Sequence, residues 1–209
     1  MGIAEERGID WRAVIDSLRS VTREIWGSLP IQEQRRFLRN VRIYWDVHRH
    51  RVAPEIADLL TDMRSEGQVQ LHTGMLTRYS SSSNGAEVAF WDRKAQSERA
   101  LKVDRFFNCT GSETDCRRIG DSLVSSLFAQ GLARPDPLFL GLHATESCQL
   151  LDHKGDASRH LYAIGPPLKG TLWETTSVGE IRQQALELAQ RLCAFLEKGQ
   201  ASDALETAV

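Results

Sequence analysis

Apolar residues recur with a helical period through the first third of the chain. Intervals of three and four residues separate Trp11, Val14, Ile15, Leu18, Val21, Ile25 and Trp26. Asp10 is suited to cap this helix, which ends at Leu29-Pro30. A second helical run covers residues 31–45, and a third begins at Pro54 and ends near Gly67. The pattern predicts a helical segment over residues 1–67.

From residue 68 onward the pattern changes to that of strands. The stretches QVQLHTGML, AEVAFW and ALKVDRFFNCTG predict three strands, the first two joined by a Ser-rich loop over residues 80–85. A helix is expected over residues 121–130, and short strands around 138–142, 148–151 and 161–164. The last predicted helix begins near Ser177 and has one apolar face: Ile181, Ala185, Leu188, Ala189, Leu192 and Leu196. We therefore expect an α/β region over residues 68–209, either as a second domain or in one compact domain with the helices.

The overall composition narrows the possible classes of protein. Among 209 residues, 41% are hydrophobic and 26% charged, which is ordinary for a soluble globular protein. A formal charge of -2 argues against a nucleic-acid binder. The sequence contains no run of about 18 apolar residues, so no membrane span is predicted. The N-terminal stretch MGIAEERGIDWR is acidic and lacks an apolar run, so no secretory signal is predicted. The cysteines lack C-x-x-C or zinc spacing, which favours reduced thiols in the cytoplasm: Cys109, Cys116, Cys148 and Cys193.

Two apolar stretches end in glycine. DRFFNCTG ends in Thr110-Gly111, and LYAIG ends in Gly165, two prolines and a loop before the helix near Ser177. Glycine permits close approach of a ligand, and dinucleotide-binding sheets hold ligands at the carboxyl ends of their strands. The free N–H groups of a helix start favour partial negative charge. One glycine alone indicates a turn, whereas two at the same sheet edge favour a bound ligand.

Several long stretches also carry a resemblance to a known family. They are WRAVIDSLR, RRFLRNVRIYWDVHRHRVAPEIA, DRFFNCTG, LARPDPLFLGL and LYAIGPPLKGTLWETTSVGEIRQQA. On these motifs the chain resembles the C-terminal portion of the bacterial FAD/NAD(P)-binding flavoprotein family. It is more distantly similar to flavin monooxygenases and N-hydroxylases.

The resemblance implies a flavin site. It places Thr110 and Gly111 beside the phosphate-binding edge of the cofactor domain, and Gly165 and Pro166 near the flavin. The residues implied to line the isoalloxazine are Gly170, Thr171, Leu172, Trp173, Glu174 and Thr175. The helix near Ser177 would direct its N-terminus at the flavin N1 and C2 carbonyl, where a reduced flavin carries negative charge.

One element of that family is missing from the chain. No G-x-G-x-x-G turn for the FAD pyrophosphate occurs in the sequence. The expected fold is therefore an N-terminal helical segment plus an incomplete dinucleotide-binding-like sheet that lacks the first βαβ unit. The chain would be a truncated relative, a split subunit or a fragment. We expect it to bind FAD only with the missing half, and to form a homo-oligomer or a complex with that half.

The stretch RIYWDVHRHR, residues 42–51, allows three functions and a purely structural role. Asp46, His48 and His50 would share one face of a strand and could bind a metal, although no metal site is favoured. A nucleic-acid patch is disfavoured by the net charge. Contact with NAD(P) or substrate is the third function, through Trp45, Arg49 and Arg51, with Tyr44 or Trp45 stacking on a ring. In the structural role, Tyr44 and Trp45 are core residues and the arginines pair with carboxylates.

Trp173-Glu174 likewise has two interpretations. The indole could form a wall of the flavin site and the carboxylate could accept a hydrogen bond. Alternatively, Glu174 is an acid near a helix N-terminus, which stabilises the helix by about 0.3–1 kcal/mol. The favoured function is the C-terminal part of an FAD/NAD(P)-binding oxidoreductase. The alternatives are a non-catalytic truncated relative that acts as an association module and, less favoured, a metal-dependent hydrolase using His48 and His50.

Overall fold

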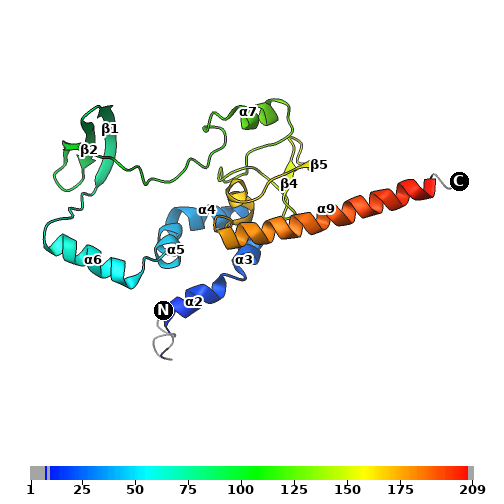
Figure 1. Cartoon of the computed structure of the whole chain (residues 1–209), viewed down its shortest axis with the longest axis horizontal. Coiled ribbons are helices and arrows are strands. Elements are labelled where there is room, and N and C mark those ends of the chain that lie inside the picture. Colours follow the sequence, from blue (N-terminus) through cyan, green and yellow to red (C-terminus); the bar gives the residue numbers. More distant parts are fainter. Residues whose placement is uncertain (1–7, 9, 207–209) are drawn as a thin grey trace. The chain divides into compact units, whose positions relative to one another are not determined.

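The chain is a mixed α/β protein that forms two compact units (Figure 1). The computed structural model describes residues 8 and 10–206, with side chains up to residue 197. The first unit joins Met1–His50 to Glu113–Val209, and the second is Arg51–Ser112. This division differs from the boundary expected at residue 67, because the third predicted helix belongs with the strands that follow it. In the part of the chain that is described, no helix is both long and apolar enough to span a bilayer.

Four short helices begin the first unit. They are α2 (Trp11–Leu18), α3 (Thr22–Ser28), α4 (Ile31–Asn40) and α5 (Arg42–Arg49). Asp10 caps α2 as predicted, since its carboxylate accepts a hydrogen bond from the Arg12 N–H at 2.9 Å. Each of the first two predicted helices is broken in two. At Val41, the second break, φ is -114°, outside the range of a regular helix.

The second unit holds a helix and an antiparallel sheet. Helix α6 (Pro54–Ser65) has proline in its first turn, as predicted. Strands β1 (Gly74–Ser82), β2 (Gly85–Asp92) and β3 (Ser97–Val103) pair in chain order. The Ser-rich loop predicted over residues 80–85 is wrong, because Ser82 pairs with Gly85 in a tight hairpin.

The strand predicted over residues 104–111 is also wrong. Strand β3 ends at Val103, and no regular structure follows before residue 113. The Asn108 side chain competes with strand pairing here, since its Oδ1 accepts hydrogen bonds from the Thr110 N–H at 3.1 Å and the Thr110 hydroxyl at 2.8 Å. Gly111 therefore does not end a strand.

The remainder of the first unit contains a small two-stranded sheet and more helices. Helix α7 (Ser122–Ala129) is capped by Asp121, and β4 (Gln149–Leu151) pairs antiparallel with β5 (Ala157–Tyr162). A 3-10 turn η1 (Pro166–Leu168), helix α8 (Lys169–Leu172) and the long helix α9 (Val178–Glu206) follow (Figure 1). The strand predicted at 138–142 is only an isolated bridge between Pro135 and Leu142. Two residues separate the end of β5 from Gly165, and Gly111 follows no strand directly. The expectation that Gly111 and Gly165 end two strands at the same sheet edge is therefore wrong.

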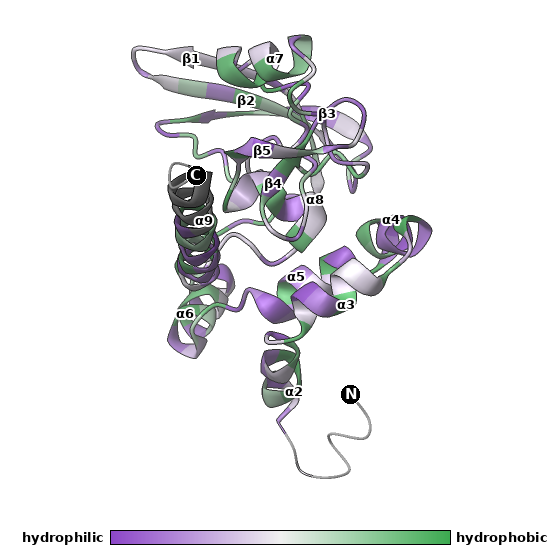
Figure 2. Ribbon diagram, turned by 90° about the vertical axis from the view of Figure 1, so that its right-hand side faces the viewer, coloured by the Kyte–Doolittle hydropathy of each residue, from purple (hydrophilic) through white to green (hydrophobic). Residues whose placement is uncertain are grey.

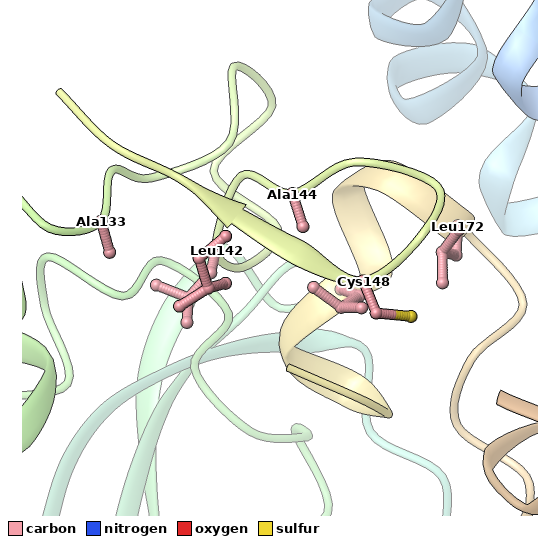
Figure 3. Packing of buried hydrophobic residues seen from close by; sticks show 7 residues of the cluster. Ala133, Leu142, Ala144, Cys148 and Leu172 are labelled. Carbon is pink, nitrogen blue, oxygen red and sulfur yellow. The ribbon is translucent and has the colours of Figure 1, made fainter. Parts of the chain in front are cut away.

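The main core of the first unit lies where the β4–β5 hairpin meets η1 and α8. Its buried members are Ala133, Leu142, Ala144, Cys148, Leu150, Leu168 and Leu172, of which Figure 3 labels five. Leu168 and Leu172 are fully buried, which stabilises the fold by about 1.5–3 kcal/mol for each side chain. Hydrophobic and hydrophilic residues are mixed along α2 to α5 (Figure 2), where a second cluster forms around Trp26, Leu140 and Trp173.

Candidate functional site

The loop from Gly165 to Thr175 is closed by one side chain of α9. The Gly165 N–H donates to Gln184 Oε1 at 2.9 Å, and Gln184 Nε2 donates to Thr175 Oγ1 at 2.6 Å. The Thr175 hydroxyl donates in turn to the Gly165 carbonyl at 2.9 Å. All three groups are buried, so the ring of hydrogen bonds holds both ends of the loop against α9.

Gly170, in the middle of the same loop, is required by packing. A Cβ here would collide with the carboxylate of Asp136, which is buried and accepts hydrogen bonds from the Leu138 N–H at 2.8 Å and the Leu140 N–H at 2.6 Å. Burial raises the pKa of Asp136, against the effect of these hydrogen bonds. The Gly170 carbonyl accepts from the Trp26 indole N–H at 2.8 Å. This glycine therefore joins α8 to α3.

Aromatic side chains from α3, α4 and the loop pack together around Trp173. The Trp26 and Trp173 rings stack with centroids 4.7 Å apart, and Phe37 lies edge-on to Trp173 at 5.3 Å. The Lys169 ammonium lies 5.2 Å from the Trp173 ring centroid. Burial lowers the pKa of Lys169, and the charge of Arg42 adds to this effect. Trp173 is thus held in place by ring contacts on the helical segment.

Glu174 links the loop to α5. The Trp45 indole N–H donates to Glu174 Oε1 at 3.1 Å, and an Arg49 Nη donates to Oε2 at 3.4 Å. The Arg49 and Glu174 side chains are each only 11% exposed. Arg49 also lies 3.6 Å from Glu180 Oε1, and Arg19 of α2 pairs with the same oxygen at 3.6 Å. Two carboxylates and two guanidinium groups therefore meet beside the start of α9.

The first turn of α9 is closed by a capping box. The Ser177 N–H donates to Glu180 Oε2 at 3.0 Å, and the Glu180 N–H donates to Ser177 Oγ at 3.4 Å. Within the described chain, no hydrogen-bond acceptor is assigned to the N–H groups of Val178 and Gly179. A Cβ on Gly179 would meet nothing closer than Ser177 Oγ at 4.0 Å. The helix start thus keeps two donors and open space around a glycine.

The structure brings together some of the predicted site residues and separates others. Trp45 and Arg49 of α5 both contact Glu174, although more than 120 positions separate them from it in the sequence, and Trp45 also packs in the cluster that contains Trp173. The other residues implied to line the flavin have local roles: Pro166 opens η1, Thr171 bonds to the Ala144 carbonyl at 3.4 Å, and Leu172 is core. Thr110, Gly111 and Arg51 belong to the second unit.

The arginine-rich stretch is helical, which changes its interpretation. Asp46 and His48 lie on α5 and His50 follows it, so the strand face proposed for a metal does not exist. Asp46 pairs with Arg42 at 3.3 Å, and His48 Nδ1 lies 2.7 Å from the Tyr44 carbonyl. Within the described residues, no three His, Cys, Asp or Glu side chains are arranged to hold a metal ion. Tyr44 is 67% exposed, so it is not a core residue.

Three residues that organise this region were not predicted. Glu180 could have been found, because Ser177-x-x-Glu180 is the sequence pattern of a capping box. Gln184 gives no such signal, because its partners Gly165 and Thr175 are 19 and 9 residues away, and the bonds of Asp136 to the Leu138 and Leu140 N–H groups follow no comparable sequence pattern. The chain matches no protein-family model, no curated protein and no solved structure.

Proposed function

We propose that this chain is the C-terminal part of an FAD/NAD(P)-binding oxidoreductase and lines the flavin and substrate side of the site. The observation that carries the proposal is the convergence of Trp45, Arg49, Trp173 and Glu174 beside the start of α9. The family resemblance implies flavin contact for Trp173 and Glu174, and the arginine- and aromatic-rich stretch 42–51 predicts NAD(P) or substrate contact for Trp45 and Arg49.

The start of α9 is chemically suited to the electron-rich edge of a flavin. The N–H groups of Val178 and Gly179 are the open donors, and Gly179 leaves space for a planar ring. A helix N-terminus favours negative charge, which a reduced flavin carries at N1. When bound, FAD would supply the redox chemistry. The residues of this chain would orient the ring and stabilise its charge.

Glu174 and Arg49 have a positioning role in this proposal. One Nη of Arg49 is paired with both Glu174 and Glu180, so these carboxylates hold the guanidinium beside the start of α9. Trp45 likewise donates its indole N–H to Glu174. Both residues therefore hold Glu174, which we assign to the substrate side of the flavin, where its carboxylate could accept a hydrogen bond.

The phosphates of FAD require a second segment. No two glycines of this chain stand two positions apart, so it contains no G-x-G-x-x-G turn. We assign pyrophosphate binding to a segment outside these 209 residues. The chain alone should therefore bind FAD weakly, because the several backbone hydrogen bonds of such a turn are missing.

Two preparations test the proposal. In the first, the chain alone is titrated with FAD while flavin fluorescence is followed. In the second, the chain is produced together with the coding sequence that flanks it, and FAD in the purified product is measured by absorption and chromatography. We expect weak binding in the first and one FAD per chain in the second. Flavin absent from the second preparation, with the chain folded, would contradict the proposal.

The alternative function is association without flavin. It is favoured by the exposed apolar side chains of α5, since Ile43, Tyr44 and Val47 are each 66–68% exposed. The same second preparation separates the two functions, because an association module would form the complex and carry no flavin.

A further inference from the structure

The helical segment of the first unit forms most of the wall of an open apolar cavity of about 150 Å³. Its walls come from α2, α3, α4 and α5 together with Trp173. The side chains that define it are Leu18, Ile25, Leu29, Phe37, Trp45 and Trp173. Trp26 and Thr22 complete the wall, and both are buried. Ile25 is the most exposed of the lining residues, at 46%.

The polar groups of the wall are already used by the protein. The Thr22 hydroxyl donates to the Leu18 carbonyl at 2.7 Å. The Trp26 indole N–H donates to the Gly170 carbonyl, and the Trp45 indole N–H donates to Glu174. These groups are therefore not available to a molecule in the cavity. A polar or charged occupant would lose its hydration without gaining hydrogen bonds from them, which is costly.

The size and the wall together specify an occupant. An apolar cavity of about 150 Å³ is large enough for a benzene-sized molecule. The wall carries three indole rings and one phenyl ring, which favour edge-to-face and offset contacts with another aromatic ring. Trp26 and Trp173 already stack on each other, and Phe37 lies edge-on to both, so these walls are held in place.

We propose that this cavity is a binding site for a single uncharged aromatic ring without hydrogen-bonding groups. The site lies within the first unit and does not depend on a bound flavin. Affinity should be modest, because a ring of this size has few atoms in contact with the wall.

Titration of the whole chain with toluene tests this inference. Three tryptophans form the wall, so their fluorescence reports occupancy, and calorimetry gives the stoichiometry. We expect saturable binding of one toluene per chain with a Kd of about 1 mM or lower. Benzoate, which has the same ring and a charged group, should bind at least about tenfold more weakly, since its carboxylate loses hydration.

Filling the cavity provides the specificity control. Ile25→Trp places a large side chain at the most exposed position of the wall and should weaken toluene binding at least about tenfold. Gln32→Trp adds the same ring at an exposed position of α4 outside the wall and should leave the affinity unchanged. Leu29→Phe is a second filling variant if Ile25→Trp does not fold. The absence of saturable toluene binding, equal affinity for benzoate, or unchanged affinity in a folded filling variant would overturn the proposal.

Discussion

The indole nitrogen of Trp45 lies 3.1 Å from Oε1 of Glu174 and joins α5 to the loop before α9. Arg49, one helical turn further along α5, holds the other carboxylate oxygen at 3.4 Å. One nearly buried carboxylate thus joins the loop before α9 to α5, through residues that precede Glu174 by 129 and 125 positions. The proposed site depends on this link, because it sets Trp173 and Glu174 beside the start of α9.

Glu174→Gln should lower the free energy of unfolding by about 1–3 kcal/mol. The amide can still accept from Trp45, but the nearly buried Arg49 loses one of its two carboxylates. Urea unfolding measures the change. Glu24→Gln, at an exposed position of α3, is the matched control and should change stability by no more than about 0.5 kcal/mol.

A double-mutant cycle with Trp45→Phe isolates the hydrogen bond itself. The coupling between Trp45→Phe and Glu174→Ala should be about 0.5–3 kcal/mol, because the two groups are in contact. Additive losses would show that the indole and the carboxylate do not interact in solution.

Glu180 should make the chain sensitive to acid. Burial alone would raise its pKa, but hydrogen bonds with Ser177 and the charges of Arg19 and Arg49 bring the pKa of Glu180 below its ordinary value of 4.5. A carboxyl with a lowered pKa in the folded state contributes stability that is complete above 4.5 and is lost as pH falls through the folded-state pKa. As the pH falls below 4.5, the Glu180→Gln variant should therefore lose less of its free energy of unfolding than the wild-type chain loses. Urea unfolding at several pH values measures it, and identical acid profiles would contradict the account.

Gly165 should tolerate no side chain, because of its backbone. Its φ of 77° and ψ of -150° lie in a region that is essentially restricted to glycine. A Cβ at Gly165 would lie 3.5 Å from Ile181, which is an ordinary van der Waals distance. The expected strain therefore comes from the backbone conformation and not from a clash of the new side chain. Gly165→Val should lower stability by about 1–3 kcal/mol. In the flavin-bearing complex it should also reduce flavin occupancy, because it disturbs the ring of hydrogen bonds through Gln184.

Gly179→Ala is the matched control for that substitution. Gly179 lies in α9, where alanine is more favourable than glycine. The free energy of unfolding of the Gly179→Ala variant should therefore rise by up to about 1 kcal/mol. Thermal melting compares the two variants. An unchanged melting midpoint for Gly165→Val would mean that the loop does not adopt this conformation.

The exposed apolar face of α5 should mediate association. Ile43 and Val47 are separated by one helical turn, and Tyr44 lies next to Ile43. Light scattering should detect an oligomer of the chain, and Ile43→Lys with Val47→Lys should shift it toward the monomer. Gln32→Lys adds a charge on α4 and should leave the oligomer intact. A wild-type chain that stays monomeric at high concentration would contradict this prediction.

The helical period predicted where the helices lie but not where they break. The breaks after α2 and at Val41 interrupt apolar patterns that would support continuous helices. They allow Trp26, Phe37 and Trp45 to pack around one cavity, which is a tertiary effect that a local pattern does not contain. The predicted capping by Asp10 was confirmed, because a cap depends only on residues within its own turn.

The strand prediction over residues 104–111 was wrong because its apolar residues are exposed and not packed in a sheet. Phe106 and Phe107 read as strand, yet they are 37% and 76% exposed, and the Asn108 side chain bonds to the following backbone. The candidate site was only partly predictable for a similar reason. Trp45, Arg49, Trp173 and Glu174 could be named from the sequence, but their contacts depend on packing between distant elements.

The occupancy of FAD in a Gly179→Phe variant tests the central claim most directly. Gly179 has open space around it, so a phenyl ring here should leave the melting midpoint of the isolated chain unchanged or higher. If the flavin lies at the start of α9, the same ring should block it. We therefore predict that the chain produced with its flanking coding sequence binds one FAD, and that Gly179→Phe in this complex loses FAD while remaining folded. Full FAD occupancy in the folded variant would contradict the claim that α9 faces the flavin.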